Sequence, residues 1–329
     1  MIFVAVLAVG VALVFQLRGL LLLVFGGILL AVALDGMAEA VAHRSSLARR
    51  WALAVVVVSL LALMAAGFVL IGAQVATQIS GLAEQVTRAV RGFSETLRGT
   101  GVGRVILRQL EEARPEQMLN SGIFGQMTGM ASSALGVLTD MLILMVIGLY
   151  FAASPARQAE GVVRLVPPVH RARARELLGV TGRALRRHLL GKLAAMTLVG
   201  VLVGTGLALI GVPFPIALGV LAGLLDFVPI FGPIVAAVPA LLLSIGQGGQ
   251  QTLLVAALFL AVQQLEGYFV LPLIEKRAVH VPPVLTVISV VGMGVLLGLP
   301  GTILAEPLTV VMVVWVRKIW IEWTLGEAG

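Results

Sequence analysis

The sequence contains no cysteine and only four histidines, which limits the chemistry available to it. Without cysteine the chain forms no disulfide, thiolate metal site or cysteine nucleophile, and the redox compartment stays open. The histidines, His43, His170, His188 and His280, all stand in polar stretches, so a buried metal cluster is not expected. We therefore expect neither a metal nor a cofactor.

Charged residues are also scarce, at 12% of the chain against 59% hydrophobic residues. A soluble domain usually carries roughly a quarter charged residues. Apolar runs at 51–71, 193–210 and 253–271 reach the ~17 to 25 residues that a helix needs to cross a bilayer. In lipid such segments must be helical, because every backbone group needs an internal partner. The sequence predicts an all-α polytopic membrane protein.

The motifs of intramembrane hydrolases are missing as well. No GxSG, GxGD or HExxH occurs, and no histidine lies in a predicted span. A hydrolase would need a nucleophile with its base, a paired-aspartate site or a zinc motif. We expect the chain not to be an enzyme.

The first segment, residues 1–19, has no basic n-region and is followed by many further spans. This pattern predicts a transmembrane helix and argues against a cleaved signal peptide. Because the segment is apolar from residue 1, we expect a short polar lead to be missing before it.

The net charge of +7 is concentrated between the apolar runs. Basic clusters occur at 43–50, at 154–192, at Lys276 with Arg277, and at Arg317 with Lys318. The positive-inside rule assigns all four to the cytoplasm, with both termini inside. The long connection at 73–130 is then external, and its nearly balanced charge is typical of a translocated loop.

This topology divides the chain into six regions. We expect transmembrane helices at 1–72, an external amphipathic helical region at 73–130, a transmembrane helix at 131–153, a basic cytoplasmic interfacial helix at 154–192, a transport core at 193–318 and a cytoplasmic tail at 319–329. The external region has apolar residues at helical spacing. They are Val75, Ile79, Leu82, Val86, Val90, Phe93 and Leu97. This stripe packs either on the protein's own outer surface or against another copy.

The basic segment combines arginines with leucines at helical spacing. The arginines are Arg171, Arg173, Arg175, Arg183, Arg186 and Arg187. Such a helix is expected to lie at the membrane surface with its arginines facing anionic head groups, so membrane lipids are the expected partner. A regulatory or gating role is the alternative. Nucleic acid is not expected, because no stacking aromatics interleave with the arginines.

Prolines and glycines interrupt two later apolar segments, 211–246 and 282–316. The first contains Pro213, Pro215, Pro229, Pro233 and Pro239, and proline removes a backbone donor and clashes with the preceding turn. We expect two broken or re-entrant hairpins, joined at 227–233 and 299–301. Gly232-Pro-Ile-Val-Ala in one resembles Gly301-Thr-Ile-Leu-Ala in the other. Paired interrupted segments of this kind indicate the binding site of a transporter.

Three stretches of this half resemble the autoinducer-2 exporter family, the PerM-like permeases. They are FVPIFGPIVAAVPA, QQLEGYFVLPLIEKRAVHVPP and GLPGTILAEPL, in this order. The match is specific across 211–316, and upstream it rests on the layout of the spans. The resemblance implies about eight spans, a homo-oligomer (a pentamer), the bacterial inner membrane and export of small polar signalling molecules. Some members of the family resemble sodium/proton antiporters.

Ionisable residues at membrane depth are costly and mark functional sites. Asp226 lies at the first break, Glu266 stands beside Gln263 and Gln264 in the middle span, and Glu306 begins the return of the second hairpin. We expect these five to bind the substrate or a coupling proton or sodium ion. The alternative is structural, because a carboxylate can cap the N-terminus of a half-helix. The expected cavity wall comprises Pro229, Gly232, Pro233, Pro239, Pro272, Gly298, Gly301 and Pro307.

The sequence therefore predicts a secondary transporter or exporter of a small polar solute, by resemblance autoinducer-2 or a related signalling molecule. The two hairpins and the intervening span would form a mobile, elevator-like or rocking unit beside a scaffold of earlier spans. A sodium/proton antiporter or a gated channel is the alternative, because broken hairpins serve those folds equally well.

Overall fold

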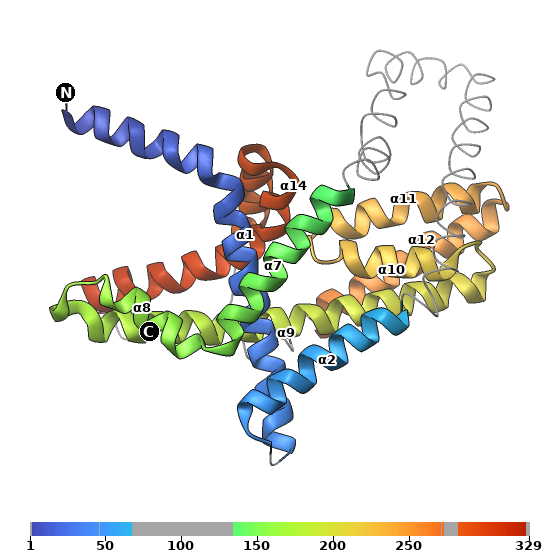
Figure 1. The fold of residues 1–329 in the computed structure, drawn as a ribbon. Helices are drawn as coiled ribbons and strands as arrows, with labels where there is room; N and C mark the ends of the chain where they lie inside the picture. The colour runs from blue at the N-terminus through green and yellow to red at the C-terminus, as the bar shows by residue number, and fades with distance from the viewer. Residues whose placement is uncertain (1, 46, 68–133, 271, 273–281, 327–329) are drawn as a thin grey trace.

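The computed structural model describes residues 2–45, 47–67, 134–270, 272 and 282–326. Over these ranges the regular structure is helical, and Figure 1 shows the helices arranged around two long ones, α1 and α9. The predicted external region 73–130 lies outside the described residues, as do Lys276 and Arg277.

The N-terminal part packs three helices together: α1 (Ile2–Arg44), α2 (Arg49–Gly67) and α7 (Ala134–Ala153). Their shared core includes Leu34, Ala38, Val56 and Ala152. The small residues let the helices approach closely. The expected first span, residues 1–19, is continuous with the next one, because α1 remains helical from its start to Arg44.

The basic segment folds into two helices and a short turn. Helix α8 (Pro155–Arg164) bends by 89° from the end of α7. A 3-10 turn, Pro168–His170, leads into α9 (Arg171–Ile210). Helix α9 is 40 residues long, about 60 Å at 1.5 Å per residue. It runs through the expected region boundary at residue 192 without a break and ends at Gly211, whose φ is +86°.

Helix α9 joins two apolar cores because it packs along its whole length. Its first half contributes Leu185 and Leu189 to a core with α1 and the end of α14. Its second half contributes Val199, Val203 and Leu207 to a core with α10, α11 and α12. In Figure 1 these three helices run alongside the second half of α9.

The first interrupted segment forms α10 (Pro215–Leu225) and α11 (Phe231–Ile245), separated by a turn at 226–230. Ile230 in that turn has φ +67°. The sequence places this break at 227–233, one residue later. Gly232 is required at the turn, because an added Cβ would lie 1.8 Å from the Leu225 carbonyl oxygen.

Helix α10 packs on α9 through glycines of both helices. A Cβ added to Gly219 would lie 2.7 Å from the Gly204 Cα, and one added to Gly223 would lie 2.7 Å from the Met196 carbonyl oxygen. The two backbones are therefore in direct contact, which small residues four apart on a helix allow.

Helix α12 (Gly249–Leu265) follows and ends in a π-helical turn, Glu266–Val270. Helix α14 (Pro283–Trp315) then continues into a π-helical segment, Val316–Thr324.

Helix α14 doubles back at Gly298, whose φ and ψ are 67° and −153°. The reversal brings Gly301 against the preceding half, since an added Cβ would lie 2.3 Å from the Met293 carbonyl oxygen. The sequence places this turn at 299–301, just after the observed position. Gly232 and Gly301, paired by sequence likeness, thus occupy the same place in their hairpins: each starts the return half against the carbonyls of the incoming half.

Four of the described helical segments are long and apolar enough to cross a membrane, or five if α7 and α8 form one bent span. Helices α10 and α11 are apolar but shorter. This arrangement fits a polytopic membrane protein. The total of about eight spans stays a prediction.

Candidate functional site

Five ionisable side chains from four parts of the fold meet on one side of α9. We call these five residues the polar cluster. Two of them, His188 and Lys192, lie one turn apart on α9. The other three are the carboxylates predicted from the sequence. Asp226 follows α10, Glu266 begins the π-helical turn after α12, and Glu306 lies in the return half of α14.

Lys192 is the central contact of the polar cluster. Its Nζ lies 3.3 Å from Asp226 Oδ2 and 3.8 Å from Glu266 Oε1. His188 Nε2 lies 3.7 Å from Glu306 Oε1. Asp226 and Glu306 are also close enough to Glu266 to interact with it electrostatically. One lysine therefore contacts two carboxylates, and the third carboxylate, Glu306, lies against His188 one turn earlier on α9.

These groups are largely shielded from solvent. Asp226 is 1% exposed and Lys192 is 8% exposed, and the side chains of His188, Glu266 and Glu306 are 12%, 13% and 16% exposed. Removing a charge from water costs several kcal/mol unless a partner compensates, so such groups are retained where they are paired or functional.

Three buried polar atoms of the polar cluster have no hydrogen-bond partner among the described residues: His188 Nε2, Asp226 Oδ2 and Glu306 Oε2. Most buried polar atoms in folded proteins are hydrogen-bonded, so exceptions need an explanation. Because these polar atoms lie close together, the polar cluster is suited to bind a proton, a cation or a polar solute.

The structural alternative for the carboxylates was capping of a half-helix N-terminus. Asp226 instead lies at the C-terminal end of α10, where the helix dipole disfavours a negative charge. The N-cap position of α11 is Ile230, with no side-chain cap hydrogen bond. Glu306 lies more than one turn past the reversal at Gly298. Neither carboxylate is placed to cap a helix, whereas Asp226 lies against Lys192 and Glu306 lies against His188.

Two predicted site residues are not brought into the polar cluster. Gln263 and Gln264 lie near the end of α12 and are both exposed. They are neighbours of Glu266 in sequence, but both are exposed, whereas the Glu266 side chain is largely shielded from solvent. Their expected part in binding stays a prediction.

The residues expected to shape a cavity lie mostly in the two hairpins. Pro229, Gly232, Pro233 and Pro239 surround the first turn or continue α11, while Gly298, Gly301 and Pro307 belong to the second hairpin. Pro307 is fully buried directly after Glu306. Pro272 is exposed, so its inclusion has no support in the packing.

His188 and Lys192 were missed by the sequence reasoning, which assigned both to the basic interfacial helix. A signal for them was present. Thr181, Leu185, His188, Lys192, Ala195 and Val199 recur at helical spacing and are all shielded from solvent on α9. Because this periodicity continues into the following apolar run, it places both residues on the inner face of one long helix.

The arginines of the basic segment have varied surroundings. Arg175 donates to Glu160 at 2.9 and 2.7 Å, and Arg186 donates to Asp35 at 2.8 Å and also to Glu39. Asp35 in turn accepts from Arg49 of α2. Four helices, α1, α2, α8 and α9, are therefore joined by ion pairs at this end of the bundle.

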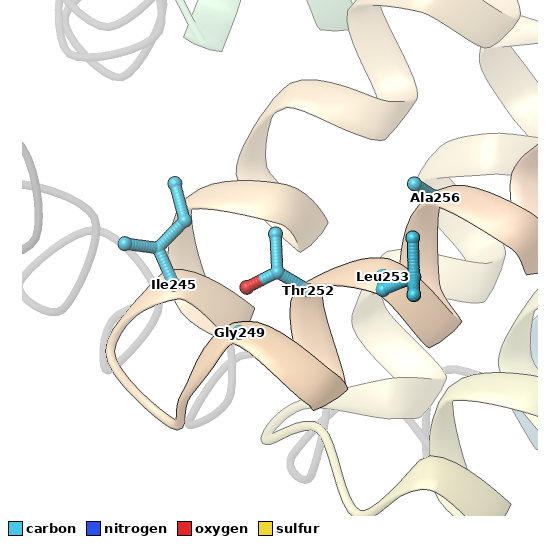
Figure 2. Close-up of a pocket in the computed structure, with 5 residues that line it drawn as sticks. All are labelled: Ile245, Gly249, Thr252, Leu253 and Ala256. Carbon is cyan, nitrogen blue, oxygen red and sulfur yellow. The ribbon is translucent and has the colours of Figure 1, made fainter.

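A surface groove lies at the turn between α11 and α12, apart from the polar cluster. Figure 2 shows its lining residues, Ile245, Gly249, Thr252, Leu253 and Ala256. None of them carries a charge, and the Thr252 hydroxyl donates to the Gly248 carbonyl. The groove thus lacks the polar groups that make the polar cluster a candidate site.

The chain is similar in sequence to several proteins that are named as transport proteins. YrrI of Bacillus subtilis, provisionally named a transport protein, is 32% identical over 45% of this chain and 42% of its own length. MT0215 of Mycobacterium tuberculosis, also provisionally named a transport protein, is 29% identical over 70% of this chain and 65% of its own. The AI-2 transport protein TqsA of Escherichia coli is 30% identical over 42% of this chain and 39% of its own.

In each case the matched part is less than two thirds of the relative's length. The model of one protein family, described as AI-2E family transporter, matches residues 1–320 of the chain. This confirms the resemblance predicted from three short segments. The chain belongs to the AI-2E family of transporters.

Proposed function

We propose that this protein is a secondary transporter that exports a small polar solute and that the polar cluster binds the solute or its coupling ion. One observation carries the proposal. Asp226, Glu266 and Glu306 come from three separate elements, the first hairpin, the end of α12 and the second hairpin, and all face α9. A site assembled from several elements can change its affinity when those elements shift.

The proposed solute follows from the family rather than from the geometry. The name of TqsA states that it transports AI-2. We extend this to the present chain as autoinducer-2 or a related small signalling molecule. The polar cluster supports a polar solute, because His188 Nε2 and Glu306 Oε2 are buried and make no hydrogen bond within the described residues, which leaves polar atoms for a solute to contact.

The charge balance of the polar cluster supports ion coupling. Three carboxylates against one ammonium group leave an excess of negative charge when every carboxylate is ionised. A poorly solvated site disfavours net charge, so the arrangement favours uptake of a proton or a sodium ion. The same count favours a second candidate function, sodium/proton antiport without an organic solute.

The packing refines which parts would move together. The glycine contacts fuse α10 to the second half of α9, and tightly packed backbones move as one body. Because α9 is unbroken from Arg171 to Ile210, we place the whole of α9 in the mobile unit with the two hairpins and α12. The scaffold would comprise α1, α2 and α7 and would be held by a homo-oligomer, a pentamer by resemblance, in the bacterial inner membrane with both termini cytoplasmic.

Flux measurements in proteoliposomes test the proposal. The wild-type chain should move autoinducer-2 in a manner that depends on a proton or sodium gradient. Asp226→Asn and Glu266→Gln should abolish that dependence, because each removes an ionisable group next to Lys192. Glu160→Gln is the matched control, since Glu160 lies on α8 and pairs with Arg175 away from the polar cluster.

The assays should run with autoinducer-2, protons and sodium in parallel. Ion exchange in the absence of any organic solute would favour the antiporter. Unchanged rates and unchanged pH dependence in both cluster variants would refute a role for the polar cluster in transport.

A further inference from the structure

The six arginines in the first half of α9 fall into two groups. Four have partners inside the protein. Arg171 donates to the Val166 carbonyl, Arg173 stacks over the Trp323 ring at 5.6 Å, and Arg175 and Arg186 form ion pairs. Arg183 and Arg187 are exposed, and neither contacts a polar group or ring anywhere in the part of the chain that the structure describes. Their charges are therefore not used to hold the fold together.

These two arginines stand one turn apart, so their side chains are neighbours on the helix surface. The same face continues with Ala194, Leu198 and Val201, which are all exposed, the last two at 38% and 59%. At about 100° per residue all five lie within roughly 60° of one another around the axis. One face of α9 thus carries two free arginines followed by an apolar stripe.

The polar cluster lies on the other side of the helix. Lys192 is about 180° around the axis from Arg183 and about 140° from Arg187. Lys192 is buried, whereas the two arginines are exposed. The arginine face therefore does not belong to the candidate transport site, and its role must be sought outside the protein core.

The orientation of Arg183 matches a membrane boundary. Its Nη1 lies 3.5 Å from the position of a Cβ added to Gly179, one turn earlier in the helix. The guanidinium thus lies back toward the helix N-terminus, away from the apolar stripe. Glu176 lies on this face about two turns before Arg183, and its carboxylate forms an ion pair with Lys318 Nζ at 2.8 Å. That acidic group is already paired.

We propose that Arg183 and Arg187 bind the phosphate of an anionic phospholipid, whose acyl chains lie along Ala194, Leu198 and Val201. In a membrane protein an exposed apolar face is covered by lipid tails, and arginine at the end of such a face reaches the head groups. Two adjacent guanidinium groups can each donate two hydrogen bonds to phosphate oxygens. The bound lipid would fix the depth of α9 in the bilayer.

Lipid titration of the full chain tests the site. The delipidated protein in a neutral detergent is titrated with phosphatidylglycerol, phosphatidylcholine or glycerol 3-phosphate, and bound lipid is counted by native mass spectrometry. Phosphatidylglycerol should bind more tightly than the other two. The Arg183→Gln/Arg187→Gln variant should bind it roughly 10- to 30-fold more weakly at low salt, from about 1 kcal/mol per basic residue near a membrane surface.

The matched control is Arg157→Gln/Arg164→Gln, which removes the same charge from exposed positions of α8. It should leave the affinity for phosphatidylglycerol within about twofold of the wild type. The Arg183→Lys/Arg187→Lys variant keeps both charges and should retain the preference for the anionic lipid. Binding to the wild-type chain should also weaken as salt is added, because exposed charges are screened.

Four results would overturn the proposal. An equal loss in the α8 control would mean a general charge effect. Equal binding of glycerol 3-phosphate would mean a free-anion site. A change of oligomer mass with no change in bound lipid would mean that this face contacts another copy of the chain. Lipid binding to the wild-type chain that does not change with salt would show that the arginines do not hold the lipid.

Discussion

The most informative single change is Lys192→Gln, because Lys192 is the only lysine or arginine in the polar cluster. It removes an ammonium group that lies 3.3 Å from Asp226 and 3.8 Å from Glu266. At an effective dielectric constant of about 20, these distances correspond to attractions of about 5 and 4 kcal/mol. Part of that loss is offset, because the lysine no longer has to be desolvated.

Breaking a buried ion pair typically costs about 3–5 kcal/mol, since the remaining charge is left without a partner. We expect Lys192→Gln to destabilise the protein by that amount. For a chain of 329 residues the apparent Tm should fall by about 4–7 °C, from an unfolding entropy of about 2.1 cal/mol/K per residue. Thermal unfolding in detergent can be followed through the fluorescence of the four tryptophans.

A double-mutant cycle separates pairing from simple loss of packing. Asp226→Asn in the Lys192→Gln background replaces both charges by neutral amides, which is far less costly than leaving one charge unpaired. The second change should restore at least half of the lost Tm. Additive effects of the two substitutions would refute the inferred ion pair. Arg157→Gln, an exposed charge on α8, should leave the Tm unchanged.

Two further predictions concern packing and the ion pairs of α1. Gly219→Ala forces a Cβ to within 2.7 Å of the Gly204 backbone and should cost about 1–3 kcal/mol in thermal unfolding. Gly182→Ala meets no atom within 4 Å and should not destabilise the fold, so equal effects of the two alanines would contradict the close contact of α9 and α10. Asp35→Asn removes one of the two acidic partners of Arg186 and the partner of Arg49, and it should cost about 1 kcal/mol, since these pairs are partly solvated. The cost should shrink at high salt, and a salt-independent Tm difference would show that the pairs contribute through packing instead.

The fold was predictable where local chemistry controls the backbone. Proline and glycine determine where a helix can continue, so the breaks near Pro229 and Gly298 followed from residue types alone. The exact turn in the second hairpin did not. The sequence placed this turn at 299–301, whereas the residue with the positive φ is Gly298. The prediction missed by one residue because several adjacent glycine and proline residues could each have formed the turn.

Region boundaries were less predictable, because they depend on what surrounds a helix. Residues 154–192 looked like a separate surface helix, since arginine is costly in lipid. In the structure α9 passes through residue 192 unbroken, and Arg186 is accommodated by Asp35 and Glu39 of α1. These partners are far away in sequence, and no local pattern reveals them.

The candidate site divides in the same way. Asp226, Glu266 and Glu306 were found from the sequence, because a carboxylate inside an apolar segment is costly wherever it points. Lys192 and His188 were not found, because in a basic segment a lysine or histidine carries no such free-energy cost and does not stand out from its neighbours.

The sequence by itself determined that the chain resides in a membrane, that two of its apolar segments are broken and that three carboxylates lie in or beside apolar segments. These properties depend on residue types and their spacing along the helix. Only the tertiary structure decided that the carboxylates meet Lys192 and His188 on α9 and that two arginines on its opposite side have no protein partner among the described residues. Charge pairing depends on distances of a few ångströms between residues far apart in the chain, and packing alone sets those distances.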